Sequence, residues 1–169
     1  MRELFERFLP DALRPKKLGL NVTPERILST RGDAERGRLV FFREGMQCSQ
    51  CHRIQGQGRE FGPDLSRIGS KYTRNQLAEE ILNPSKTIDP AFVTYDVETA
   101  SGQSYSGFIV KRAADEITVK DADLALIRVP TAEIKHIDRR QLSVMPEGLL
   151  QSMTQQDAAD LIEFLSSLR

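Results

Sequence analysis

The sequence predicts an α+β protein in which a mainly helical domain is interrupted by a small antiparallel β region. Apolar residues recur with helical spacing near both ends of the chain, and from residue 91 to residue 139 they alternate with polar residues. The composition, 39% hydrophobic and 28% charged over 169 residues, is ordinary for a globular chain that buries one core and a small second unit.

The charge balance and the hydropathy exclude two classes of partner. The 24 Lys and Arg residues equal the 24 Asp and Glu residues in number, so no net charge attracts nucleic acid or an anionic membrane. No apolar run approaches the roughly 18 residues of a membrane span. We therefore expect neither nucleic-acid binding nor membrane insertion of this segment.

Residues 1–32 are expected to form a helical extension of short helices broken by prolines. Leu4, Phe5 and Phe8 make one apolar face. This face should dock on the rest of the chain, because the segment is too small to fold alone.

Four helix starts are marked by capping residues. Each has a side-chain oxygen that can accept a hydrogen bond from the first helical turn. In the second helix Gly37 precedes Phe41 by one turn on the same face, which predicts that another helix crosses closely there. The caps are Thr23, Asp33, Thr73 and Thr154, and the last three helices are predicted over 33–45, 73–83 and 154–168.

Between the helices that begin at Thr73 and Thr154, the spacing of apolar residues changes. They no longer recur about every 3.6 residues, as in a helix, but every second residue, as in a strand. Val93, Tyr95 and Val97 alternate with polar residues, which is typical of a half-buried strand. Further short runs follow, separated by turn-forming residues, and this spacing predicts a small antiparallel sheet or barrel. The strand predictions cover residues 93–97, 104–110, 116–120, 125–129 and 133–137.

One motif, Cys48-Ser-Gln-Cys51-His52, contains the only two cysteines of the chain. Two thiols three positions apart on one helical turn can form thioethers with the two vinyl groups of a haem, and the next residue then offers its imidazole to the iron. The motif therefore predicts one covalently bound haem c, tethered by Cys48 and Cys51 and ligated by His52.

Other interpretations of the motif are weaker. A thioredoxin-like redox pair needs its cysteines after a strand of a βαβ unit, whereas the segment before Cys48 is predicted to be helical. A structural zinc site needs four ligands, and adjacent Cys51 and His52 are poorly disposed to share one ion with Cys48 and His136. Two incidental thiols are disfavoured by the spacing.

The second axial position of the iron needs another ligand. Met145 precedes Pro146, which holds the chain extended and restrains the thioether, a soft ligand that raises the reduction potential. Met46, Met153 and His136 are the rival ligands. Met46 lies only two residues before the tether, and His136 falls in a predicted strand.

The loop after the motif is framed by glycines and contains Pro63. Its carbonyl oxygen could accept the Nδ1–H of His52 and leave Nε2 for iron, although a plain turn is the alternative for a Gly-Pro pair. The residues expected to line the ring are Phe41, Ile54, Phe61, Leu65, Ile68, Leu77, Ile81, Val144 and Leu149.

These residues resemble class I cytochrome c, where the same features occur in the same order. The features are the Gly37/Phe41 helix, the Cys-x-x-Cys-His motif, Gly62-Pro63-x-Leu65, Met145-Pro146 and a terminal helix with Leu161 and Phe164. More closely, residues 28–169 resemble the haem-binding domains of the Pirellula/Verrucomicrobium type, through Asn83-Pro-Ser-Lys86 and Ser143-Val-Met-Pro-Glu-Gly-Leu149. The resemblance implies thioether attachment at Cys48 and Cys51, axial ligation by His52 and Met145, and a hydrogen bond to the Pro63 carbonyl.

The resemblance also implies a division of the chain. Residues 33–90 and 140–169 would form the cytochrome c domain, and residues 91–139 a β-rich insertion similar to a small SH3-like or Sm-like barrel. The insertion separates Met145 from His52 by 93 positions. Two roles are possible for the insertion. It is either a rigid filler that closes the distal side of the haem or a surface that binds a partner.

The implied function is that of a c-type cytochrome domain for one-electron transfer. It is not expected to be an enzyme on its own, because no catalytic base, nucleophile or substrate pocket is visible. The chain starts without a signal peptide, so we expect a periplasmic or otherwise extracytoplasmic module of a larger exported oxidoreductase. Its partner would be another redox protein or a fused dehydrogenase domain. A haem-based ligand-binding or sensing domain, and a haem-free interaction module that uses the β insertion, are the alternatives.

Overall fold

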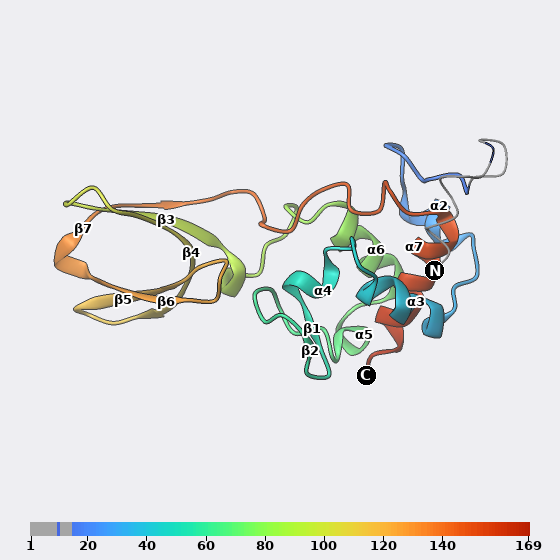
Figure 1. Ribbon diagram of the computed structural model, residues 1–169, viewed down its shortest axis with the longest axis horizontal. Coiled ribbons are helices and arrows are strands. Elements are labelled where there is room, and N and C mark those ends of the chain that lie inside the picture. The colour runs from blue at the N-terminus through green and yellow to red at the C-terminus, as the bar shows by residue number, and fades with distance from the viewer. Residues whose placement is uncertain (1–9, 11–14) are drawn as a thin grey trace.

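The computed structural model describes residue 10 and residues 15–169 of the chain (Figure 1). Figure 1 shows a helical part and a β region side by side along the long axis, joined by two connecting segments. The helices are α2 (Pro24–Leu28), α3 (Ala34–Phe42), α4 (Cys48–Cys51), α5 (Ile68–Lys71), α6 (Arg74–Leu82) and α7 (Gln155–Ser167), with 3₁₀ turns η2 (Pro90–Phe92) and η3 (Thr131–Glu133). The strands are β1 (Arg53–Ile54), β2 (Gln57–Gly58), β3 (Thr94–Thr99), β4 (Ser104–Arg112), β5 (Glu116–Lys120), β6 (Leu126–Pro130) and β7 (Ile134–Arg139).

The helices begin at the predicted capping residues. Side-chain oxygens of Asp33 and Thr154 accept backbone N–H groups of the first turns of α3 and α7, at 2.9 and 3.0 Å. Thr23 caps α2 in the same way at 3.3 Å. Thr73 and Gln76 form a reciprocal capping box at the start of α6. The four helix predictions are therefore confirmed.

Helices α3 and α7 cross so closely that only glycine fits at the contact. A Cβ atom on Gly37 would lie 1.9 Å from the carbonyl oxygen of Asp160 in α7. One turn later Phe41 is 1% exposed, and its ring lies edge-on to that of Phe164 with 6.0 Å between the centroids. The crossing predicted at Gly37 is confirmed, and it fixes the segment before the Cys-x-x-Cys-His motif against the C-terminal helix.

The helical part has one apolar core, to which the described part of residues 1–32 contributes. Leu18 and Ile27 are buried in this core. The N–H of Leu18 donates to the carbonyl of Met153 at 2.8 Å, just before α7. The apolar face predicted for Leu4, Phe5 and Phe8 lies outside the described residues.

The β region is a five-stranded antiparallel sheet in the order β6-β5-β4-β3-β7. Strands β3 to β6 pair with their neighbours in sequence, and β7 returns after η3 to pair with β3. A second apolar cluster lies within this region, separate from the helical core. It contains Val97, Ile117, Val119 and Val129.

The five strands predicted from the alternating pattern are confirmed, each within two residues at either end. The short hairpin of β1 and β2 was not predicted, because two-residue strands are too short to carry an alternating pattern. Its turn is made by Gln55 and Gly56, whose φ angles are 49° and 81°. Within residues 15–169, none of the helices combines the length and the apolar character needed to span a bilayer.

Candidate haem site

The two cysteines lie on a single helical turn, α4. The turn is closed by the N–H of His52, which donates to the carbonyl of Cys48 at 2.8 Å. Both thiols are free and half-buried. Burial raises the pKa of the Cys48 thiol, opposed by a backbone hydrogen bond. The two sulfur atoms therefore belong to one rigid turn, as attachment to one macrocycle requires.

His52 follows the turn in an extended conformation and is held by the next loop. Its Nδ1 lies 2.9 Å from the carbonyl oxygen of Pro63, which can only accept, so Nδ1 carries the proton. Burial lowers the pKa of the imidazole, and the hydrogen bond to Pro63 opposes that effect. Within the described residues Nε2 makes no hydrogen bond, so a neutral ring offers its free lone pair at Nε2.

Backbone hydrogen bonds fix the loop that carries Pro63 to the motif. The N–H groups of Phe61 and Gly62 both donate to the carbonyl of Cys51, at 3.1 and 2.7 Å. Gly62 lies against the imidazole itself, since a Cβ there would be 2.8 Å from Cε1 of His52. The loop therefore contacts the ring of His52 and also sets the position of its hydrogen-bond acceptor.

A cavity of about 220 Å³ lies beside Cys48, and its two walls come from distant parts of the chain. One wall is residues 45–48 and the other includes residues 146–149, directly after Met145. A second cavity of about 330 Å³ adjoins it at Gly148 and Leu149 and extends to Ile81. The larger cavity is near the lower end of the about 300–1,000 Å³ typical of small-molecule sites, and the smaller one is below it.

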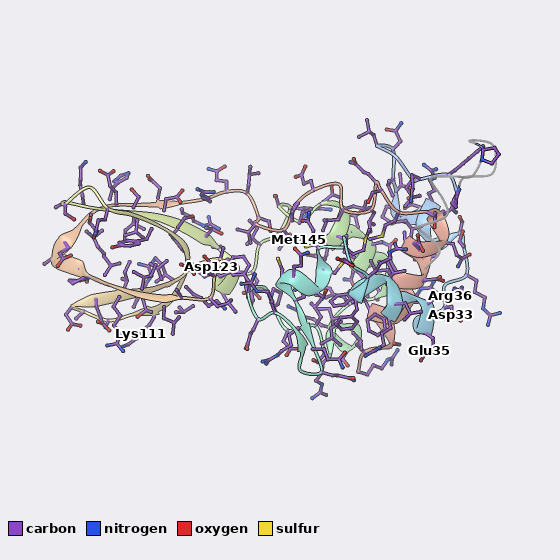
Figure 2. All side chains as sticks on the ribbon, in the orientation of Figure 1. Asp33, Glu35, Arg36, Lys111, Asp123 and Met145 are labelled. Carbon is purple, nitrogen blue, oxygen red and sulfur yellow. The ribbon has the colours of Figure 1, made fainter. Side chains whose placement is uncertain are left out.

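Met145 is half-buried in the segment that connects β7 to α7. Its N–H donates to the hydroxyl of Ser143 at 3.1 Å, and the N–H of Ser143 donates to the hydroxyl of Ser85 at 3.1 Å. In the view of Figure 2 Met145 is labelled near the end of the helical part that faces the β region. The two segments that connect the β region to the helices are thus tied together next to Met145.

The rival ligands occupy different surroundings. Met46 and Met153 line the cavity beside Cys48, and Met153 is only 1% exposed within the helical core. His136 is exposed on β7, where its Nε2 lies 3.0 Å from Oδ1 of Asp138. His136 is therefore engaged within the β region, whereas three methionines remain near the motif.

Most of the residues expected to line a ring belong to the helical core or pack against it. Two differ. Phe61 places its ring against Phe108 of β4, with 4.8 Å between the centroids. Val144 is 41% exposed, because it lies on the connecting segment. The residues in or against the core are Phe41, Ile54, Leu65, Ile68, Leu77 and Ile81.

The surroundings of the motif also bear on the other interpretations of the two thiols. The segment before α4 is helix α3, so the cysteines do not follow a strand of a βαβ unit. Among the residues that the structure describes, no group of three or more His, Cys, Asp or Glu side chains is arranged to hold a metal ion.

Comparison with known proteins identifies the family. The family model for cytochrome c matches residues 34–127, more than half of the chain. The chain belongs to the cytochrome c family. It is also similar to a cytochrome c-553-like protein of Synechocystis sp., with 28% identity over 79 residues, which cover 47% of this chain and 71% of the relative.

Membership of the cytochrome c family assigns the cofactor and the general role. The cofactor is a covalently bound haem c, and Cys48, Cys51 and His52 fit its Cys-x-x-Cys-His motif. The role is haem-based electron transfer with redox partners. The family match ends at residue 127, ahead of Met145, so the assignment of the second axial ligand depends on the residues of this chain.

Some contacts around the site were not predicted from the sequence. The approach of Gly62 to the imidazole had a partial signal, because Gly62 adjoins Pro63 and glycine permits close approach. The bond between Ser143 and Ser85, and the contact of Phe61 with Phe108, join residues that are far apart in the chain. No local pattern in the sequence marks such pairs.

Proposed function

We propose that this chain is a one-electron carrier in which His52 and Met145 would hold the haem iron. The observation that carries the proposal is the state of His52. Its Nδ1–H is committed to Pro63 at 2.9 Å, its Nε2 has no partner among the described residues, and it directly follows a helical turn that carries two free thiols. Two thiols and one available imidazole nitrogen are the donor set that haem c requires.

The two cysteines of the motif and Pro63 of the next loop have different tasks in this proposal. Cys48 and Cys51 hold the macrocycle in place, and Pro63 keeps the imidazole in the tautomer and orientation that leave Nε2 for iron. The haem, when bound, supplies the one-electron chemistry between ferrous and ferric iron. The chain supplies an apolar surround from the helical core, which disfavours the more highly charged iron and raises the reduction potential.

The assignment of Met145 is supported by its position in the chain. The residues after it form the wall opposite Cys48, and Pro146 restricts the backbone beside it. The tie between Ser143 and Ser85 restrains this segment although the β region separates it from His52 in sequence. Met46 and Met153 are the alternatives, because they line the same cavity.

The three methionines are distinguished by replacing each with leucine, which conserves volume and removes the thioether. We expect Met145→Leu to abolish the far-red charge-transfer band of ferric haem bound to methionine. We also expect it to lower the reduction potential by on the order of 0.1 V. Changes of axial ligand shift haem reduction potentials over a range of about 0.8 V. Met46→Leu and Met153→Leu should keep the band.

Absorption spectra and redox titrations of the three variants check this prediction. If Met46→Leu or Met153→Leu loses the band and Met145→Leu keeps it, the methionine replaced in the variant without the band is the ligand, and the assignment of Met145 is wrong. A native protein with a high-spin spectrum that shifts on addition of carbon monoxide would instead support the ligand-binding alternative. Electron transfer itself requires a reversible titration that follows the Nernst equation for one electron.

We further propose that the chain divides into a cytochrome c domain, residues 33–90 and 140–169, and an inserted β domain, residues 91–139. The strand order, with β7 returning beside β3 after a single 3₁₀ turn, supports an SH3-like or Sm-like barrel for the insertion. The whole is then a haem domain of the Pirellula/Verrucomicrobium type. Such a domain would belong to a larger exported oxidoreductase and exchange electrons outside the cytoplasm with a fused dehydrogenase domain or another redox protein.

A further inference from the structure

The loop that positions His52 has a second side, and that side rests on the β region. Three consecutive residues of the loop each contact it. Arg59 donates from Nη2 to the carbonyl of Ala122 at 2.9 Å. The carbonyl of Glu60 accepts from Nζ of Lys120 at 2.9 Å. The ring of Phe61 lies against that of Phe108, with centroids 4.8 Å apart.

Phe108 is at the centre of this contact. It is 1% exposed, yet it belongs to neither of the two apolar clusters in the described part of the chain. Its ring is covered by Phe61 from the loop and by Phe92 of η2, whose centroid lies 5.7 Å away. Lys120 is its partner in the β4-β5 register, so one point of the sheet presents both contacts. Phe108 is therefore buried by the junction itself.

The opposite side of the same loop holds the imidazole. Phe61 and Gly62 donate to the carbonyl of Cys51, Gly62 lies against the ring, and Pro63 accepts from Nδ1. The contact with Phe108 and the first contact with His52 are therefore made by adjacent residues, Phe61 and Gly62. Because consecutive Cα atoms stay about 3.8 Å apart, a displacement of the Phe61 backbone is passed on to its neighbour Gly62.

We propose that Phe108 and Lys120 are positioning residues for His52, acting through the loop 59–63. The β region then serves as a support on the histidine side of the haem, rather than as a cover for the methionine side. This inference depends on the proposed function for its consequence, namely that the support restrains the axial imidazole and so the reduction potential. The contacts themselves join residues of this chain and are measurable with or without haem.

The test compares three variants of the full chain. Lys120→Met removes the ammonium and keeps an apolar stem, and Phe108→Leu removes the aromatic contact while filling most of the volume. Lys111→Met is the matched control, because Lys111 lies on β4, is exposed, and pairs with Glu116 inside the β region at 3.2 Å. Figure 2 shows Asp123, next to Ala122, at the end of the β region that faces the helices, and Lys111 farther away.

Amide hydrogen exchange of Phe61 and Gly62 is the first readout. We expect exchange about ten-fold faster in Lys120→Met and Phe108→Leu, with the amides of α7 unchanged, because the loop opens locally without unfolding the core. The second readout is the ¹⁵N shift of the His52 ring, which should move in both variants. Lys111→Met should match the native protein in both measurements.

Two results would overturn this inference. In the first, Phe61 and Gly62 exchange at the native rate in both variants, so the β region merely rests on the loop. In the second, every amide including those of α7 accelerates equally, so the effect is a global loss of stability. A colourless protein would refute the proposed function separately, because the exchange measurement needs no haem.

Discussion

Replacing Gly37 with alanine should strongly destabilise the protein. No other addition of a single methyl group to α3 should cost as much stability. The new Cβ would lie 1.9 Å from the carbonyl oxygen of Asp160 and 2.7 Å from Cβ of Phe164, so two helices would have to separate. Overpacking costs about 1–3 kcal/mol and occasionally more, and here the obstacle is backbone. We expect a loss at or above the upper end of that range.

The gain from replacing glycine in a helix offsets only part of this loss, roughly 0.5–1 kcal/mol. Leu39→Ala is the control in the same helix, since Leu39 is 68% exposed and should change the free energy of unfolding by less than about 0.5 kcal/mol. Urea unfolding of both variants measures the difference. Equal stabilities of Gly37→Ala and the native protein would show that the crossing is looser than described.

Asp160 should be the most important charged residue for stability. It is 2% exposed, and its carboxylate accepts from the N–H of Asp33, from Nε and Nη2 of Arg36, and from Nε2 of Gln156, all between 2.7 and 2.9 Å. Asp160→Asn replaces one acceptor oxygen by a donor. Hydrogen bonds to a charged group contribute about 1.5–3 kcal/mol each, so we expect a loss of that order at pH 7.

The stability conferred by Asp160 should depend on pH in a defined direction. Burial acts to raise the pKa of Asp160, but the hydrogen bonds from Arg36, Gln156 and Asp33 outweigh it and lower the pKa below its ordinary value. A carboxyl with a lowered pKa in the folded state stabilises the fold fully above its unfolded pKa of about 3.9. That contribution is lost as the pH falls through the lowered folded value.

This pH dependence is tested by measuring the free energy of unfolding of the native protein and of Asp160→Asn between pH 7 and pH 2. The difference in free energy of unfolding should be constant above about pH 5 and shrink below about pH 4, where the carboxyl of the unfolded chain protonates. Glu35→Gln is the control for loss of one negative charge, because Glu35 is exposed in the first turn of α3 (Figure 2). A difference that stays constant to pH 2 would contradict the assignment.

The elements that the sequence predicted correctly are those with local signals. The caps at Asp33, Thr73 and Thr154 act within one turn, and the alternation from Val93 onward reflects the pleat of single strands. The Cys-x-x-Cys-His motif is local in the same sense. Its chemistry could therefore be inferred before the fold was known.

Contacts between distant residues could not be predicted in this way. Asp160 and Arg36 lie 124 positions apart, and a single acid on a helix ordinarily faces water. The contact of Phe61 with Phe108 was equally hidden, and the expectation that Phe61 lines the haem stays a prediction. Whether Met145 is the second axial ligand stays a prediction, because Met46 and Met153 also lie near the motif.

The intact mass of the full chain, exported in a host that attaches haem c, tests the central claim most directly. We predict the mass of the polypeptide plus one haem and a visible haem spectrum, with Ser49→Ala, between the cysteines, unchanged. The double variant Cys48→Ser with Cys51→Ser should have the mass of the polypeptide alone. A native chain that is colourless and has only the polypeptide mass, under conditions where a control cytochrome acquires its haem, would contradict the account.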